Sequence, residues 1–98
     1  MTRDFRPTHP GVVLREIIDE LGISQAQLAR DIGVSAMRIS HIVKGARPVT
    51  GELALKLGRY FRQTPQFWMN MQARFDMETA KEKHGSEIRK IHPSPKAA

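Results

Sequence analysis

The sequence of 98 residues contains no cysteine, which excludes disulfides, thiolate metal sites and cysteine nucleophiles. It also lacks any apolar run of about eighteen residues, the length that a membrane-spanning helix needs. No apolar run follows the arginines between Met1 and Pro10, so we expect no secretory signal. From these absences together we expect a cytoplasmic protein.

The patterns that accompany catalysis are missing as well. No glycine-rich phosphate loop is present, and the carboxylates of Glu16, Asp19 and Glu20 follow the spacing of a solvated helix face rather than an acid–base pair. The histidines are scattered, and none has metal-ligand spacing with another or with a carboxylate. They are His9, His41, His84 and His92. We therefore predict a protein that is not an enzyme and has no cofactor and no metal site.

What the sequence does have is an excess of positive charge. Sixteen Lys and Arg stand against ten Asp and Glu, a formal net charge of +6. Taken alone, this excess fits either a partner that is a polyanion or a basic protein that is merely soluble. Its distribution favours the first reading, because Ser24 to Arg47 holds four cations against one anion, half of the excess in about a quarter of the chain. Such a concentration is suited to a phosphate backbone.

Apolar residues recur at helical spacing along most of the chain, and glycine and proline mark the ends of the segments. Five helices are expected. They run from Pro10 to before Gly22, from the cap Ser24 to Gly33, from the cap Ser35 to Gly45, from Thr50 to Phe61, and from Thr64 and Pro65 onward. Ser24 and Gln27 have the spacing of a capping box. Gly58, inside the fourth helix, either admits a close neighbour or weakens that helix.

Together these segments predict one all-α, five-helix domain, because a chain this short buries a single core. We place a flexible arm at residues 1–8, the DNA-binding and dimerisation domain at 9–83 and a flexible tail at 84–98. Within the tail, Glu87 to Ile91 is a weak candidate for a short strand.

The second and third helices have the spacing of a helix-turn-helix. Counted from Gln25 as position one, Ala29 is the fifth residue and Gly33 the ninth. A small fifth residue lets two helices cross closely, and glycine tolerates the positive φ of a tight turn. The remaining required positions are all apolar: Leu28, Ile32, Val34, Ile39 and Ile42. A plain helical hairpin has less need of the alanine and the glycine, so the spacing predicts a motif that binds duplex DNA.

The residues left on the outer surface of this motif are the candidate DNA contacts. They are Gln25, Ser35, Ala36, Met37, Arg38, Ser40, His41, Lys44 and Arg47. Gln25, at the start of its helix, is placed to contact a phosphate, and Ser35 can cap its helix and touch a phosphate as well. Lys44 and Arg47 are expected to hold the DNA backbone.

Few of these side chains can read bases directly. Ala36 and Met37 can only contact thymine methyl groups. Arg38 and His41 are the long polar side chains placed to reach base edges, although an intramolecular ion pair or a phosphate contact fits Arg38 equally well. For His41 we favour a surface position or a phosphate contact over a pH switch. Operator shape is therefore expected to supply part of the specificity.

The last helix has more large apolar residues than one face can bury. They are Phe67, Trp68, Met69, Met71, Phe75 and Met77. We expect Trp68 in the core and Met71 with Phe75 at a homodimer interface, while complete absorption of the helix by the monomer core is the alternative. A symmetric dimer would place its recognition helices about 34 Å apart, one turn of B-DNA.

The order and spacing of several motifs resemble those of the HigA antitoxins of type II toxin–antitoxin modules, in the Xre/lambda-repressor-like group. The motifs are His9-Pro10-Gly11, Ser24-Gln25, Leu28-Ala29, Gly33-Val34-Ser35, Ile39-Ser40, Gly45 to Thr50, Ala54 to Leu57, Phe61 and Thr64 to Gln72. The resemblance covers about Thr8 to Ala80. Its helix-turn-helix part is common to the whole group, whereas His-Pro-Gly and the later Pro-x-x-Trp are typical of HigA.

The resemblance implies a homodimer that binds an operator palindrome at its own promoter. It also implies a protein partner, a HigB toxin, which is a RelE-like ribosome-dependent mRNA endonuclease that the antitoxin neutralises. Ala36 and Met37 occupy positions that vary widely in the family, so the operator sequence does not transfer. The segment after Ala80 matches no motif, which leaves its role open.

Two other functions fit the sequence. The first is a free-standing repressor of the same fold without a toxin, which only the neighbouring gene would distinguish. The second is a protein that holds a toxin and no longer binds DNA, and the basic outer surface of the motif argues against it.

Overall fold

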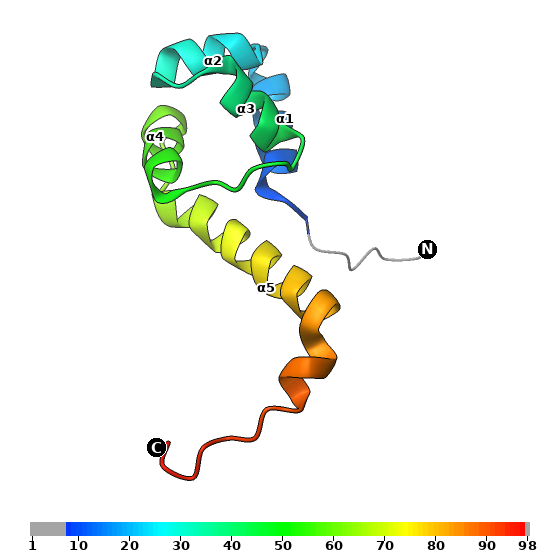
Figure 1. Ribbon diagram of the computed structural model, residues 1–98. Helices are drawn as coiled ribbons and strands as arrows, with labels where there is room; N and C mark the ends of the chain where they lie inside the picture. Colours follow the sequence, from blue (N-terminus) through cyan, green and yellow to red (C-terminus); the bar gives the residue numbers. More distant parts are fainter. Residues whose placement is uncertain (1–7, 98) are drawn as a thin grey trace, which may run out of the picture.

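The computed structural model describes residues 8–97 of the chain. Within that range it contains five helices and no strand, so the prediction of an all-α, five-helix fold is confirmed (Figure 1). The helices are α1 (Pro10–Leu21), α2 (Gln25–Ile32), α3 (Ala36–Val43), α4 (Gly51–Phe61) and α5 (Pro65–Arg89). The arm expected at residues 1–8 lies outside the described residues except for Thr8. None of the helices in the described range is long and apolar enough to cross a membrane.

The two helices of the predicted motif begin at serine caps, as expected. Ser24 Oγ accepts a hydrogen bond from the backbone N–H of Gln27 at 3.0 Å, and Ser35 Oγ accepts one from the N–H of the residue three positions on at 3.1 Å. The capping box is only half formed, because the Gln27 side chain donates to Asp31 at 2.8 Å instead of returning to the cap. At the start of α5, Thr64 is the N-cap residue but makes no side-chain cap hydrogen bond, and Pro65 occupies the first turn.

One hydrophobic core is shared by all five helices. Its buried members are Leu14, Ile18, Leu28, Ala29, Ile39, Ile42, Val49, Leu53, Ala54, Leu57 and Trp68. Trp68 is the largest of them and is fully buried, as predicted, and its indole N–H donates to Gln63 Oε1 at 2.9 Å. The buried Gln72 of α5 accepts a hydrogen bond from the N–H of Val49 at 2.7 Å. This contact satisfies a backbone donor that burial would otherwise leave unpaired.

Two glycines allow helices to approach each other more closely than a side chain would permit. A Cβ atom added at Gly11 of α1 would lie 1.9 Å from the carbonyl oxygen of Ile42 in α3. A Cβ at Gly58 would lie 2.8 Å from the carbonyl oxygen of Gln63, in the segment that leads into α5. Gly58 therefore admits a close neighbour, and α4 continues through it without interruption.

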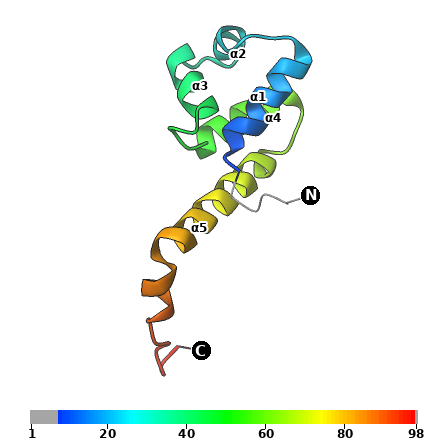
Figure 2. The ribbon, with the colours of Figure 1, turned by 90° about the vertical axis from the view of Figure 1, so that its right-hand side faces the viewer.

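The C-terminal half of α5 extends away from the body formed by the other helices (Figures 1 and 2). The strand predicted at Glu87 to Ile91 is wrong, because α5 continues to Arg89 and residues 84–89 of the expected tail are helical. A helix satisfies its own backbone hydrogen bonds, whereas a lone strand has no partner. His84 Nδ1 lies 3.7 Å from Glu87 Oε2, one helical turn further along α5. From Lys90 to residue 97 the chain has neither helix nor strand.

Candidate nucleic-acid interface

The segment from α2 to α3 has the geometry of a helix-turn-helix. Gly33, which ends α2, has a φ of 72°, in the left-handed region that glycine adopts without strain. The N–H of Val34 donates to the carbonyl of Ala29 at 3.0 Å and closes the turn. The apolar positions required by the motif are buried or half-buried. They are Leu28, Ile32, Val34, Ile39 and Ile42.

The outer face of α3 presents a mixed surface of apolar, polar and basic side chains. Ala36 and Met37 begin the helix and are exposed, Met37 to 68%. Ser40 and His41 follow one turn later and are half-buried. Lys44, the C-cap residue, follows after a further turn, so these side chains share one side of the helix.

The remaining predicted contacts lie at the edges of this face. Arg47 is exposed in the segment after α3, Ser35 is exposed at the N-cap, and Gln25 is half-buried at the first position of α2. Neither Arg47 nor Lys44 forms an ion pair with another residue in the described part of the chain. Among residues 8–97, therefore, no carboxylate neutralises these two cations.

Arg38 points toward the protein rather than outward. Its guanidinium forms an ion pair with Glu52 Oε1 at 2.9 Å and donates to Thr50 Oγ1 at 3.0 Å. The hydrogen bond from Arg38 holds the pKa of the Glu52 carboxyl below its usual value. The sequence left base reading, a phosphate contact and an intramolecular ion pair open for this residue, and the structure of the single chain shows the ion pair.

A row of side chains on α4 holds the helix-turn-helix in place. Glu52 contacts α3 through the ion pair just described, Lys56 Nζ lies 3.5 Å from the carbonyl of the turn glycine, and Tyr60 donates to Asp31 of α2 at 2.5 Å. The hydroxyl of Tyr60 lowers the pKa of the Asp31 carboxyl, and Asp31 in turn raises the pKa of Tyr60. We call Glu52, Lys56 and Tyr60 the α4 brace. Sequence reasoning missed it, although the four-residue spacing of long polar side chains on one helix face was a usable signal.

His9 joins three parts of the fold. Its Nδ1 accepts a hydrogen bond from the N–H of Gly11 at 2.9 Å and so caps α1. Its ring packs edge-on against Phe75 of α5, with the centroids 4.9 Å apart. Burial lowers the pKa of His9, against smaller raising effects of a hydrogen bond with the backbone of Arg47 and the charge of Asp76. The neutral imidazole therefore stabilises the position of the segment that contains the candidate phosphate contact Arg47.

This depressed pKa predicts that the protein loses stability in mild acid. Between the folded-state pKa and the unfolded value of about 6.5, the unfolded chain binds more protons, so the free energy of unfolding falls as pH falls through this window. Denaturant unfolding between pH 7.5 and pH 5 measures the effect. The variant His9→Asn keeps a cap acceptor but cannot titrate, and it should show a flatter profile than the unaltered chain. Parallel profiles for the two proteins would contradict the role assigned to His9.

The helix-turn-helix family model matches residues 14–68. Virulence-associated protein I of Dichelobacter nodosus is 41% identical over 75 residues, which are 76% of this chain and 69% of that protein.

Two solved structures resemble nine tenths or more of the chain. The antitoxin HigA of Pseudomonas aeruginosa, solved with the higBA promoter, has a TM-score of 0.86 at 43% identity and covers 90% of this chain and 98% of its own. The antitoxin GraA in complex with its operator has a TM-score of 0.86 at 38% identity and covers 99% of both chains.

Proposed function

Because this chain belongs to the HigA-type antitoxins of the helix-turn-helix family, we propose that it represses its own promoter and neutralises a toxin encoded beside it. The family is one of DNA-binding antitoxins and regulators and is not a family of enzymes. The proposed protein partner is a HigB-type, RelE-like mRNA endonuclease, and the proposed DNA target is an operator palindrome. The proposed location of the protein is the cytoplasm. The observation that supports DNA binding most directly is the outer face of α3, where Ala36, Met37 and Lys44 are exposed while Arg38 pairs with Glu52 of α4 on the inner side.

We assign the roles on the DNA from exposure and charge. Lys44 and Arg47, exposed and free of ion pairs within residues 8–97, bind phosphates. Gln25 and Ser35 contact the backbone near the start of their helices, where N–H groups also face the anion. Ala36 and Met37 enter the major groove and contact thymine methyl groups. Ser40 and His41 lie one helical turn further along α3, on the same side of the helix. Shape and deformability of the operator supply the rest of the specificity.

We propose that α5 forms the homodimer interface, with Met71 and Phe75 contributing. Both side chains are only half-buried in the single chain, although Met71 packs on the core and Phe75 contacts His9. Exposed Phe67 and Met77 lie on the same helix and add apolar area that a second copy would cover. A two-fold axis would present two α3 helices to one palindrome.

The purified full chain tests this function in two assays. A gel shift with its native promoter should show saturable binding of a dimer, with the mass of the complex measured by light scattering. The RelE-like protein encoded by the adjacent gene should lose its mRNA cleavage activity when the chain is added. Operator binding without such a neighbour would leave a free-standing repressor, and toxin neutralisation without a shift at low salt would leave a purely protein-binding role.

The ion pair of Arg38 predicts how its loss affects DNA binding. Arg38→Ala removes the contact between α3 and Glu52, so the recognition helix is held less firmly, and affinity should fall by about threefold to tenfold for every operator sequence. Titration against a panel of single-base operator variants measures this. Relaxed specificity at one base position, with a loss of about 1–3 kcal/mol there, would instead show that Arg38 leaves Glu52 and reads that base.

A further inference from the structure

The segment between α3 and α4, residues 44–50, is neither helix nor strand and contains the proposed phosphate contact Arg47. We call this segment the α3–α4 loop. Its first half is tied to α3, because the carbonyl oxygen of His41 accepts hydrogen bonds from the N–H of Ala46 at 2.8 Å and from that of Arg47 at 3.3 Å. A loop held only at this end would have to be ordered when Arg47 meets a phosphate, which costs affinity. The support of its second half therefore matters for DNA binding.

The second half of the loop is held by α5. Gln72 is only 5% exposed, and its Oε1 accepts a hydrogen bond from the N–H of Val49 at 2.7 Å. The amide of Gln72 is itself oriented, because its Nε2 donates to Asp76 Oδ1 at 2.9 Å, one turn further along α5. Burial keeps water from replacing the contact with Val49. The loop backbone is thus fixed two residues after Arg47.

The same helix supports the first half of the loop through His9. Phe75 follows Gln72 by three residues on α5 and packs edge-on against the His9 ring. That ring lies beside Gly45, where an added Cβ would be 3.7 Å from His9 Cγ, and it also bonds to the backbone of Arg47. Residues three positions apart share one face of a helix. One face of α5 therefore supports the loop on both sides of Arg47.

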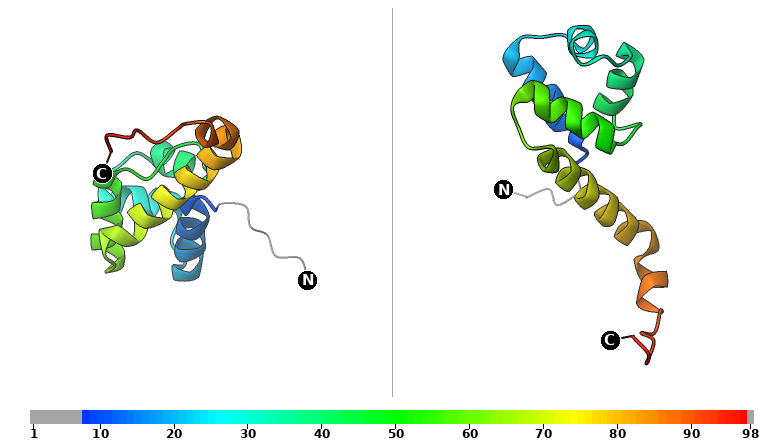
Figure 3. Two further views of the ribbon diagram at one scale, coloured as in Figure 1. Left: turned by 90° about the horizontal axis from the view of Figure 1, so that it is seen from below. Right: turned by 90° about the vertical axis from the view of Figure 1, so that its left-hand side faces the viewer.

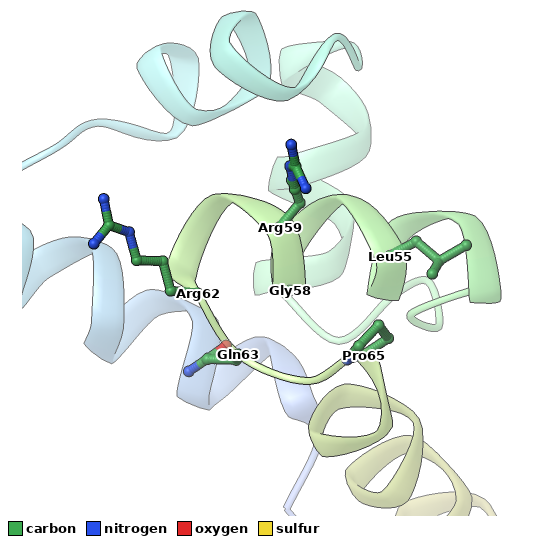
Figure 4. A pocket seen from close by; sticks show the side chains of 6 residues that line it. All are labelled: Leu55, Gly58, Arg59, Arg62, Gln63 and Pro65. Carbon is green, nitrogen blue, oxygen red and sulfur yellow. The ribbon is translucent and has the colours of Figure 1, made fainter.

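The part of α5 that holds the loop is firmly attached to the rest of the fold. Seen from below, the first half of α5 crosses the body formed by the other helices (Figure 3, left). Its start lies against the end of α4, where a Cβ on Gly58 would be 2.8 Å from the carbonyl oxygen of Gln63 and 3.1 Å from the nitrogen of Pro65 (Figure 4). Trp68, one turn before Gln72, is fully buried. Gln72 therefore cannot shift without disturbing the core.

We propose that Gln72 is a positioning residue for DNA binding, which holds the α3–α4 loop so that Arg47 meets a phosphate without further ordering. This inference rests on the proposed function, because it concerns a DNA contact of the same repressor. Gln72 is buried in the chain and acts through Arg47 rather than by touching DNA. Met71 and Phe75 lie on the same part of α5. The helix proposed to pair two copies therefore also sets the position of their phosphate contacts.

Gln72→Met tests the inference, since methionine nearly keeps the length and volume of the side chain but offers no amide oxygen to Val49. Operator affinity should fall by about tenfold. The plot of log affinity against log salt concentration should flatten by roughly 1–2, because the proposed dimer presents Arg47 twice. Gel-shift titrations of the native promoter at several salt concentrations measure both quantities. Light scattering should show an unchanged oligomeric state, which separates the effect from dissociation of a dimer.

Gln63→Met is the matched control. It makes the same chemical change and also breaks a side-chain hydrogen bond, the one that Gln63 Oε1 accepts from the indole of Trp68 at 2.9 Å. This bond lies at the start of α5 and does not involve the α3–α4 loop. Both variants should be less stable than the unaltered chain. The salt slope of operator binding should change only for Gln72→Met.

A double-mutant cycle separates positioning from a general loss of stability. In an Arg47→Ala background, Gln72→Met should lower operator affinity by less than about twofold, because the side chain through which Gln72 acts is absent. The same substitution should cost about tenfold when Arg47 is present. Equal losses in the two backgrounds would show that Gln72 only stabilises the fold and would overturn the inference.

The unaltered chain gives a readout that needs no substitution. If a fixed loop favours DNA binding, bound DNA must favour the fixed loop by the same free energy. Exchange of the Val49 N–H with solvent should therefore slow by about tenfold when operator is added. The N–H of Gln63, bonded to the carbonyl of Gly58 at the other end of α4, should change less.

The remaining outcomes distinguish this inference from the proposed function. Unchanged operator affinity and salt slope of Gln72→Met would overturn the inference and leave the proposed function intact. Exchange of the Val49 N–H that does not respond to operator would overturn it as well. Operator binding by Arg47→Ala as tight as that of the unaltered chain would remove the contact that Gln72 is proposed to position. Failure of the unaltered chain to bind its promoter would overturn the proposed function itself.

Discussion

Replacing Gly11 by alanine should lower the free energy of unfolding by about 3 kcal/mol, although alanine is normally the better helix residue. The added Cβ would lie 1.9 Å from the backbone oxygen of Ile42, which cannot move aside as the end of a flexible side chain can. α1 and α3 must therefore separate, and the C-terminal end of the recognition helix moves with them. The melting temperature should fall by roughly 12–24 °C for a domain of this size.

Gly51→Ala is the matched control for this substitution. Gly51 is the first residue of α4, and an added Cβ there meets nothing within 4 Å. The same chemical change should therefore be neutral or stabilise the protein by about 0.5 kcal/mol, because it restricts the unfolded chain. Both variants should be compared at one protein concentration, since a dimer makes melting depend on concentration. Equal melting temperatures for the two variants would contradict the close approach of α1 and α3.

The other large effect is expected on DNA binding. The double variant Lys44→Glu/Arg47→Glu should reduce operator affinity by about a thousandfold in low salt, because the proposed dimer presents each altered side chain twice. Losing four phosphate contacts should also flatten the plot of log affinity against log salt concentration by roughly 3.6. Gel-shift titrations at several salt concentrations measure both quantities.

The control for charge reversal is Lys83→Glu/Arg89→Glu on the protruding half of α5, which changes net charge equally at a distance from α3. It should lower affinity slightly at low salt and leave the salt slope unchanged, since it removes no phosphate contact. A slope for Lys44→Glu/Arg47→Glu equal to that of the unaltered chain would remove both residues from the interface. The proposed contact surface would then have to be moved elsewhere on the protein.

The sequence predicted the helix-turn-helix well because the motif depends on short-range signals. Gly33 marks the turn, and Ser24 and Ser35 cap the two helices. The spacing of apolar residues within each helix identifies its buried face. Each of these signals lies within about one helical turn of the structure that it predicts. Such signals can be read without knowing what the segment packs against. The all-α fold class could be predicted for the same reason, since local capping residues, glycine or proline mark the beginning or the end of each helix.

The contacts between distant residues were not accessible in this way. Arg38 and Glu52 are fourteen positions apart, and only the crossing of α3 and α4 shows that they meet. The extent of α5 was underestimated for a different reason. Isoleucines among charges, followed by Pro93, resemble a tail, whereas local helix propensity and self-satisfied backbone hydrogen bonds carry the helix to Arg89 without any packing partner.

The α4 brace has a consequence for how this protein can evolve. α4 contacts the motif at Arg38, at Asp31 and at the carbonyl of Gly33. Because these contacts hold α3 in position, its outward side chains are not needed for that purpose. Substitutions at Ala36 or Met37 should therefore change the preferred operator while leaving the fold unharmed. A duplicated copy of the gene could acquire its own DNA target in a few mutational steps, and two such antitoxins could then work in one cell without regulating each other's promoters.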